Sequence, residues 1–476
     1  MFGITTLQDW TPSRGPVVCW HASPAAMDRA RQAPVIAVPP SYQQAQHLRR
    51  YREHAARGHD LSRLMIFTWD VAGRCDVRAM SFALNAHLRR HDSYHSWFDC
   101  EASGRIVRHT IADPAGIELV PVEHPEMTAA DLRHHIGAPH PLRWDCFVFG
   151  IVQSDDHFTF YASIAHLLAD PMVMGVLFTE IHAMYGALVG GEPPVALPDA
   201  GRYADYCLRQ QRDAAALTVE SPRVRGWMRF AADNGGTLPY YPLPLGDLSV
   251  PHAGKLITET LMDERQSERF EAACVAAGAR FSGGVFACAA LTQRELTGAD
   301  AFAVVTTTDT RRTATELATM GWFTGLVPVS VPAGATLFPD AARAAQASFD
   351  AGLELATVPF DRVVELAPPA MGLTRPRPGN FVMSFLDASI APLSTVANSD
   401  LNFRIYDEGR ISHQVSMWVN RFQHETTVTV LFPDNPVARE SIDRYLGAMK
   451  SVYARVADGG HGRSLAGARP AATRAD

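Results

Sequence analysis

Residues 160–172 read FYASIAHLLADPM and place one histidine at the end of an apolar run. His166 is followed four residues later by Asp170 and then by Pro171. A neutral imidazole near pH 7 can remove a proton from a hydroxyl group, and a nearby carboxylate can hold such a site in shape. A structural role is the alternative, because aspartate is a common N-cap and proline is favoured at the first helical position. The spacing alone leaves both interpretations open.

Other histidines also have spacings that could support chemistry. His95 and Asp99 repeat the H-x-x-x-D spacing, but no apolar strand leads into them. His87, His91 and His95 recur every four residues and would share one face of a helix, as metal ligands can. No carboxylate accompanies them in the H-E-x-x-H manner, and two arginines crowd the same face. We therefore expect a structural or solvated stripe and no metal site.

Motifs for a serine nucleophile and for nucleotide binding are missing from the sequence. There is no G-x-S-x-G elbow, no P-loop, and no G-x-G-x-x-G after a strand. If the chain is an enzyme, we expect it to work without a nucleotide cofactor and without a serine acyl-enzyme.

The elements that would position His166 follow from hydrophobic periodicity. Strands are predicted at 62–71, 147–153 and 158–165, and helices at 41–57, 76–91 and 171–189. His166 then falls where a strand gives way to a helix, at a sheet edge where clefts form. Residues 1–34 are expected to be irregular.

A second α/β half is predicted after a connection rich in proline and glycine, at about 190–254. In that half, helices are expected at 264–278, 282–296 and 437–456, and strands at 255–262, 301–308, 326–331, 380–386, 411–420 and 426–432. The last residues are expected to be disordered.

Length and composition limit the classes of protein. The 476 residues predict two domains of roughly 200 residues each. The net charge of -7 suggests no surface for nucleic acid. Seven cysteines without a C-x-x-C pair indicate buried thiols in a reducing compartment. The N-terminus lacks the pattern of a signal peptide, and no apolar run is long enough for a transmembrane segment, so the cytosol is the expected location.

Several segments resemble the HxxxD acyltransferase superfamily, which includes condensation domains of peptide synthetases. The likeness is greatest to its mycobacterial polyketide-associated (Pap) acyltransferases, especially those that acylate trehalose. The matching segments are ITTLQDWTP, VVCWHASP, PPSYQQAQHLRRY, SRLMIFTWD, LRRHDSYHSWF, AHLLADPMVMG, GWFTGLVPVSV and GRISHQVSMWVNRF. The resemblance implies an α/β fold of two similar chloramphenicol-acetyltransferase-like lobes in a V, with a central channel. In this chain the lobes would be residues 1–190 and 255–458, with 191–254 connecting them and 459–476 as a disordered tail.

Some family features are absent. Ala165 stands where many relatives have a second histidine, and Pro171 stands where a glycine often follows the aspartate. No clear D-F-G-W-G segment is present, which argues against a domain that forms peptide bonds.

The resemblance also implies a site. His166 would be the general base, and Asp170 would support the site by pairing with an arginine, for which Arg312 is the first candidate and Arg311 the second. Ser384 is a candidate for oxyanion support. The Met172/Met174 region and GWFTGLVPVSV could line an apolar tunnel, and a sulfated acceptor would need an arginine-lined pocket.

The expected reaction moves a long fatty acyl group from acyl-CoA to trehalose or trehalose 2-sulfate, with no cofactor. The alternatives are another lipid alcohol of the phthiocerol, glycopeptidolipid or wax type, or a non-catalytic scaffold for a polyketide synthase. A polyketide synthase or a lipid transporter is an expected partner, and the inner face of the plasma membrane is an expected place of action.

Overall fold

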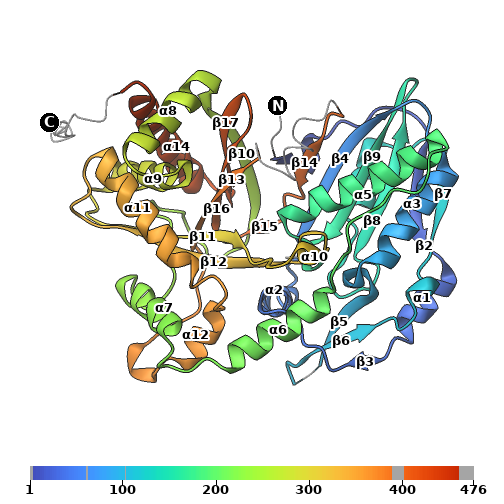
Figure 1. Ribbon diagram of the computed structural model, residues 1–476, viewed down its shortest axis with the longest axis horizontal. Coiled ribbons are helices and arrows are strands. Elements are labelled where there is room, and N and C mark those ends of the chain that lie inside the picture. The colour runs from blue at the N-terminus through green and yellow to red at the C-terminus, as the bar shows by residue number, and fades with distance from the viewer. Residues whose placement is uncertain (1–3, 61–62, 102, 389–400, 460–476) are drawn as a thin grey trace.

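The computed structural model describes residues 4–60, 63–101, 103–388 and 401–459 of the chain. Two lobes lie side by side, and each is built on its own seven-stranded sheet (Figure 1). The α/β class and the two similar lobes expected from the sequence are confirmed.

The N-terminal sheet has the strand order β1-β14-β4-β9-β8-β2-β7, so β9 lies at its centre. Its strands are β1 (Ile4–Thr6), β2 (Val17–Ala22), β4 (Leu64–Ala72), β7 (Leu119–His124), β8 (Phe147–Gln153), β9 (His157–Ala165) and β14 (Arg404–Asp407). β9 pairs antiparallel with β4 on one side and β8 on the other, and all but its first residue are buried. This burial explains why β9 is a continuous apolar run rather than an alternating one.

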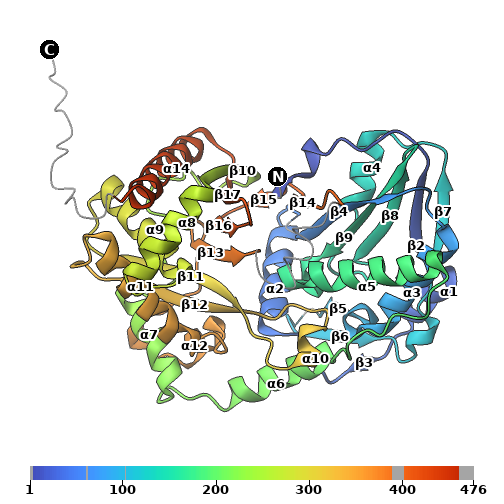
Figure 2. The same cartoon turned by 45° about the horizontal axis from the view of Figure 1, so that its top comes forward.

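Helices cover the N-terminal sheet and its lower edge (Figure 2). They are α1 (Pro24–Arg31), α2 (Tyr42–Ala55), α3 (Val77–Arg90), α4 (Ala129–Ile136) and α5 (Pro171–Gly190), with short 3₁₀ turns at Leu7–Asp9, Asp92–His95, Pro114–Gly116 and His166–Leu168. A small sheet of β3 (Val35–Ile36), β6 (Ile106–Thr110) and β5 (Ser96–Cys100) flanks them. The expectation that residues 1–34 are irregular was wrong, because β2 is a buried strand paired with both β7 and β8.

The C-terminal sheet has the order β12-β11-β13-β16-β17-β10-β15. Its strands are β10 (His252–Asp263), β11 (Phe302–Asp309), β12 (Thr324–Val331), β13 (Phe381–Asp387), β15 (Ile411–Ser412), β16 (Val415–Arg421) and β17 (Glu425–Pro433). Its helices are α8 (Glu264–Ala276), α9 (Phe281–Thr297), α10 (Ala314–Leu317), α11 (Phe338–Leu353), α12 (Phe360–Leu366) and α14 (Pro436–Ala457), with a 3₁₀ turn at Pro369–Met371.

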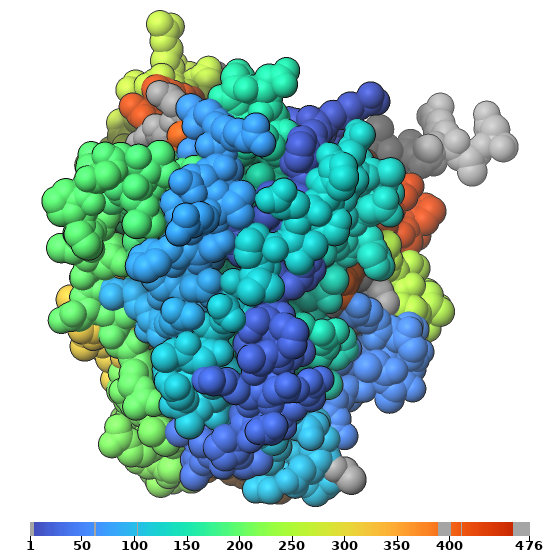
Figure 3. All heavy atoms as spheres, turned by 90° about the vertical axis from the view of Figure 1, so that its right-hand side faces the viewer, coloured from blue at the N-terminus to red at the C-terminus, as the bar shows by residue number. Residues whose placement is uncertain are grey.

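The lobes are not separated purely by chain order. β14 follows most of the C-terminal lobe in the chain, yet it joins the N-terminal sheet between β1 and β4. The expected connection contains two helices, α6 (Tyr203–Ala215) and α7 (Pro222–Asp233). In Figure 3 this green segment runs along the left edge of the blue and cyan face of the N-terminal lobe. Most of the expected tail, residues 460–476, lies outside the described residues.

One helix, α5, is long and apolar enough to cross a membrane, and α8 with α9 passes the same test only as a bent pair. Val173, Leu177 and Ile181 of α5 are fully buried in the core of the N-terminal lobe. In this structure α5 is therefore a core helix.

Candidate active site

His166 is held where the central strand of the N-terminal sheet ends. Ala165 is the last residue of β9 and pairs with Leu64, the first residue of β4. The backbone N–H of His166 donates to the carbonyl of Arg63, 2.8 Å away, which fixes the start of the following 3₁₀ turn. The strand–helix junction expected from the sequence is confirmed.

The His166 ring lies against an aromatic residue of the other lobe. Its centroid is 4.2 Å from that of Trp322, which precedes β12. Burial lowers the pKa of the imidazole to about 3, and the charge of Arg63 acts in the same direction. The ring is therefore neutral near pH 7. The ring is half-buried, and Nδ1 is buried without a hydrogen-bond partner in the described residues.

Asp170 begins α5 and also joins the two lobes. Its side chain caps the helix by accepting from the N–H of Met172 at 3.1 Å, with Pro171 at the first helical position. It accepts as well from the N–H of Phe323 in the other lobe, at 2.8 Å. The helix cap is confirmed, and the same carboxylate also contacts the other lobe; its support of a catalytic site stays a prediction.

The arginine that pairs with Asp170 is Arg311. Nη1 and Nη2 of Arg311 lie 2.8 and 3.2 Å from the two carboxylate oxygens, and the arginine side chain has no exposed surface. Arg312, the first candidate, was wrong: it points outward and meets Asp213 at 3.6 Å, with 46% of its side chain exposed. Both arginines lie beyond the end of β11, and the chain turns there so that Arg311 faces Asp170 and Arg312 faces Asp213.

The Arg311–Asp170 pair is ionised in the folded chain. Burial opposes the charge on Arg311, but Asp170 and Asp309 raise the pKa of the guanidinium above its usual value. Burial also raises the pKa of Asp170, while Arg311 and the Phe323 N–H act in the opposite direction. We favour the ionised carboxylate, because Asp170 accepts all four of its hydrogen bonds, two from backbone N–H groups and two from the Arg311 guanidinium.

Arg311 also organises the loop that carries Trp322. Its guanidinium donates to the carbonyls of Glu316, Thr319 and Gly321 and lies 4.2 Å from the centre of the Phe323 ring. The pair therefore fixes the Trp322 loop against the strand–helix junction that holds His166.

The expected helical stripe of three histidines does not form: His87 lies on α3, His91 ends that helix, and His95 lies in the following 3₁₀ turn, all of them buried. His87, His91 and Glu180 offer three ligand atoms within 4.8 Å of one another. His87 Nδ1 and His91 Nε2 lie 2.8 and 2.9 Å from one oxygen of Glu180, a carboxylate that α5 supplies. Arg90 donates to the other oxygen at 2.9 Å. Burial opposes ionisation, but the two histidines lower the pKa of the Glu180 carboxyl below its usual value. The carboxylate comes from a second helix, so no local H-E-x-x-H spacing signals it in the sequence.

The other H-x-x-x-D pairs do not form comparable sites. His95 Nε2 contacts the carbonyl of Leu88 at 3.1 Å, and Asp99 is exposed on β5. A third pair, His109 and Asp113, was overlooked in the sequence; His109 stacks on a tryptophan and Asp113 caps a 3₁₀ turn.

Ser384 lies on β13, where its hydroxyl is 2.7 Å from that of Thr307. Its role in oxyanion support stays a prediction.

Sequence reasoning did not single out three residues around His166: His47 on α2, Arg63, and Trp322 as an individual contact. Trp322 lies within the GWFTGLVPVSV segment expected to line a tunnel. His47 follows three residues after a capping glutamine on α2 and offers no motif of its own.

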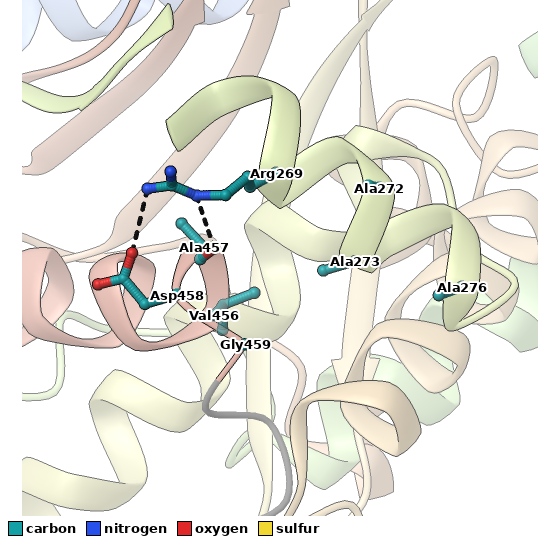
Figure 4. A pocket seen from close by; sticks show the side chains of 8 residues that line it. All are labelled: Arg269, Ala272, Ala273, Ala276, Val456, Ala457, Asp458 and Gly459. Atoms are coloured by element: carbon teal, nitrogen blue, oxygen red, sulfur yellow. Dashed lines mark hydrogen bonds and ion pairs between the residues drawn. The ribbon is translucent and has the colours of Figure 1, made fainter. Parts of the chain in front are cut away.

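A surface pocket of about 580 Å³ lies in the C-terminal lobe, far from this chemistry (Figure 4). It is lined by α8 and the end of α14, including Arg269, Ala272 and Asp458. We do not assign the activity to this pocket, since it contains neither His166 nor any neighbour of that residue.

The two lobes and the arrangement of His166, Asp170 and Arg311 at the end of the central strand are consistent with the condensation domain fold. Residues 45–385 match the condensation domain family, and the chain belongs to that family.

The most informative relatives come from mycobacteria. The chain is 74% identical over 459 residues to trehalose-2-sulfate acyltransferase PapA2 of Mycobacterium tuberculosis (strain ATCC 25618 / H37Rv), covering 96% of this chain and 98% of the relative. It is 53% identical over 460 residues to 2'-acyl-2-O-sulfo-trehalose (hydroxy)phthioceranyltransferase PapA1 of M. tuberculosis (strain CDC 1551 / Oshkosh), covering 96% and 89%. The resemblance to the Pap acyltransferases is confirmed.

Solved structures agree on the fold. The structure of PapA2 acyl transferase matches with a TM-score of 0.95 at 74% identity, over 96% of this chain and all of that one. The first condensation domain of the calcium-dependent antibiotic synthetase matches with a TM-score of 0.65 at 15% identity, over 88% and 96% of the two chains. The second likeness supports the fold alone.

Proposed function

We propose that this chain is an acyltransferase that moves a long-chain fatty acyl group from acyl-CoA to a hydroxyl of trehalose 2-sulfate or trehalose, in the assembly of a cell-envelope glycolipid. The observation that carries the proposal is the neutral His166 ring at the end of β9, packed on Trp322 of the other lobe. The acceptor rests on the 74% identity to a trehalose-2-sulfate acyltransferase.

In the proposed reaction, His166 Nε2 removes the proton from the acceptor hydroxyl. The oxygen then attacks the thioester carbonyl directly and forms a tetrahedral intermediate. That intermediate expels the CoA thiolate, which takes the proton from the imidazolium and regenerates neutral His166. No bond forms between the acyl group and the enzyme.

The lowered pKa keeps the His166 ring in its neutral, proton-accepting form at pH 7, and it also makes the ring a weaker base than a free imidazole. Asp170 acts by positioning, because its carboxylate is fully engaged with Arg311, Phe323 and the first turn of α5.

The site of action in this proposal is the cytoplasm, at the inner face of the plasma membrane. There the chain could receive an acyl group from a polyketide synthase and pass its product to a lipid transporter.

The product of the purified protein tests the proposal. Palmitoyl-CoA is incubated with trehalose 2-sulfate, with trehalose, or with a long-chain alcohol, and products are identified by mass spectrometry. An acylated sugar is expected. Acylation of the long-chain alcohol alone would replace the sugar acceptor, and no transfer to any acceptor would contradict an acyltransferase role.

Asp170→Asn and Asp99→Asn form a matched pair, because both carboxylates have the same spacing from a histidine. Only Asp170→Asn is expected to reduce product formation. Equal losses would remove Asp170 from the account.

A further inference from the structure

Two arginines, Arg50 and Arg63, act electrostatically on His47, and Arg63 also acts on His166. Arg50 lies on α2, and Arg63 immediately precedes β4. In the described part of the chain neither takes part in an ion pair, whereas Arg49 next to Arg50 pairs with Asp361 at 2.6 Å. Arginines without an anion in a half-buried setting are unusual, because their desolvation is not compensated.

These groups adjoin the reactive histidine. The carbonyl of Arg63 receives the backbone N–H of His166 at 2.8 Å. Trp322, which packs on His166, also lies 6.0 Å from the His47 ring. His47 precedes Arg50 by three residues on α2, so both project from one face of that helix.

α2 lies where the lobes meet in both Figure 1 and Figure 2. Gln43 on the helix donates to the carbonyl of Thr324 in the C-terminal lobe. A ligand held on this helix would therefore sit between the lobes.

His47 is the buried histidine of this face. His47 is 7% exposed, and its Nε2 is buried with no hydrogen bond in the described residues. Burial lowers the pKa of His47 to about 3, and His166, Arg63 and Arg50 act in the same direction. Burial also lowers the pKa of Arg50, with Arg63 adding to the effect. Burial is the largest cause of both shifts, and Asp361 and Glu53 act on the pKa of Arg50 in the opposite direction.

Nearby acidic groups do not neutralise the two arginines. Asp361 is already paired with two other arginines, and Glu53 is exposed. Asp407 and Glu408 approach Arg63, but burial raises the pKa of both carboxyls, that of Glu408 to about 8 with Asp407 contributing. Burial therefore disfavours negative charge on these two carboxyls.

We propose that Arg50, Arg63 and His47 form an oxyanion pocket beside His166 that binds the sulfate ester of the acceptor sugar. The inference rests on the proposed function and assigns residues to its acceptor. Guanidinium groups bind sulfate through paired, charge-assisted hydrogen bonds, and His47 supplies a further N–H. A phosphate of CoA has the same chemistry. The position beside His166 favours the sugar, because the pantetheine arm separates the CoA phosphates from the reacting thioester.

The test compares acceptors and donors in steady-state kinetics. Arg50→Gln, Arg63→Gln and the control Arg52→Gln, which alters the same helix, are assayed with trehalose 2-sulfate and with trehalose. With the sulfated sugar, kcat/KM of each pocket variant is expected to fall by about tenfold to one-hundredfold, which corresponds to one charged hydrogen-bonded contact. With trehalose, the fold-loss in kcat/KM is expected to be at least about tenfold smaller. Inorganic sulfate is expected to compete with trehalose 2-sulfate in the wild type and more weakly in both variants.

Each other outcome overturns the pocket in a distinct way. Equal losses with both sugars would mean that the arginines only support the fold. Losses with acyl-CoA that vanish with an acyl-pantetheine donor would assign the pocket to CoA phosphate. If the wild type acylates neither sugar, the proposed function itself fails, whatever the variants do.

Discussion

Replacing Arg311 by glutamine removes the cation that faces Asp170 and leaves the carboxylate buried between the lobes. Breaking a buried ion pair by removing one partner costs about 3–5 kcal/mol. Asp170 would keep its hydrogen bonds from Phe323 and Met172, so we expect the lower end, about 3 kcal/mol of unfolding free energy. Arg312→Gln is the matched control, because its pair with Asp213 spans 3.6 Å between side chains that are 46% and 43% exposed. Its expected cost is about 0.5 kcal/mol or less.

Urea unfolding followed by tryptophan fluorescence and by circular dichroism measures both variants against the wild type. Coincident transitions by the two probes are required before the free energies are compared. Equal destabilisation by Arg311→Gln and Arg312→Gln would refute the reasoning, as would a larger effect of Arg312→Gln.

Three further predictions concern the surroundings of the site. Trp322→Ala removes the ring that packs on His166 and is expected to lower kcat/KM by about tenfold, which is equivalent to one aromatic contact of about 1.4 kcal/mol. Trp322→Phe is expected to retain most activity, and equal rates for the two variants would contradict a packing role. Glu180→Gln removes the carboxylate that bonds two buried histidines and Arg90 and is expected to cost about 3 kcal/mol in urea unfolding, whereas no change would show that the cluster does not stabilise the fold. The free energy of unfolding is expected to fall as the pH is lowered. The folded pKa of His47 and of His166, about 3, lies below the unfolded value of about 6.5, so the unfolded chain binds more protons. Each of the two histidines is therefore expected to cost about 1.4 kcal/mol of stability between about pH 7.5 and pH 5.5. Unfolding free energies at the two pH values check this prediction, and a protein that is more stable at pH 5.5 would contradict it.

The sequence predicted the elements around the site because their periodicity is strong. β9 and α5 lie almost where the apolar run and the Asp170–Pro171 signal place them. β2 was missed since its VVCWHA segment sits among Trp, Pro and His residues that suggested irregular chain. The position of β14 in the N-terminal sheet depends on pairing between residues far apart in the chain, which local pattern does not encode.

The site itself was only partly predictable. His166 and Asp170 were found through one short segment and a family resemblance. The choice between Arg311 and Arg312 depends on which way the chain turns after β11, and adjacent identical residues carry no signal for that. His47, Arg63 and Glu180 come from other elements and meet their partners only after the lobes fold.

The most direct test of the account is kcat/KM for acyl transfer by His166→Ala, measured on protein shown by urea unfolding to be folded. With a general base removed, transfer from palmitoyl-CoA to trehalose 2-sulfate is expected to slow by about 10²–10⁴-fold. Transfer within a factor of about two of the wild type, well below that range, would contradict the assignment of His166 as the base.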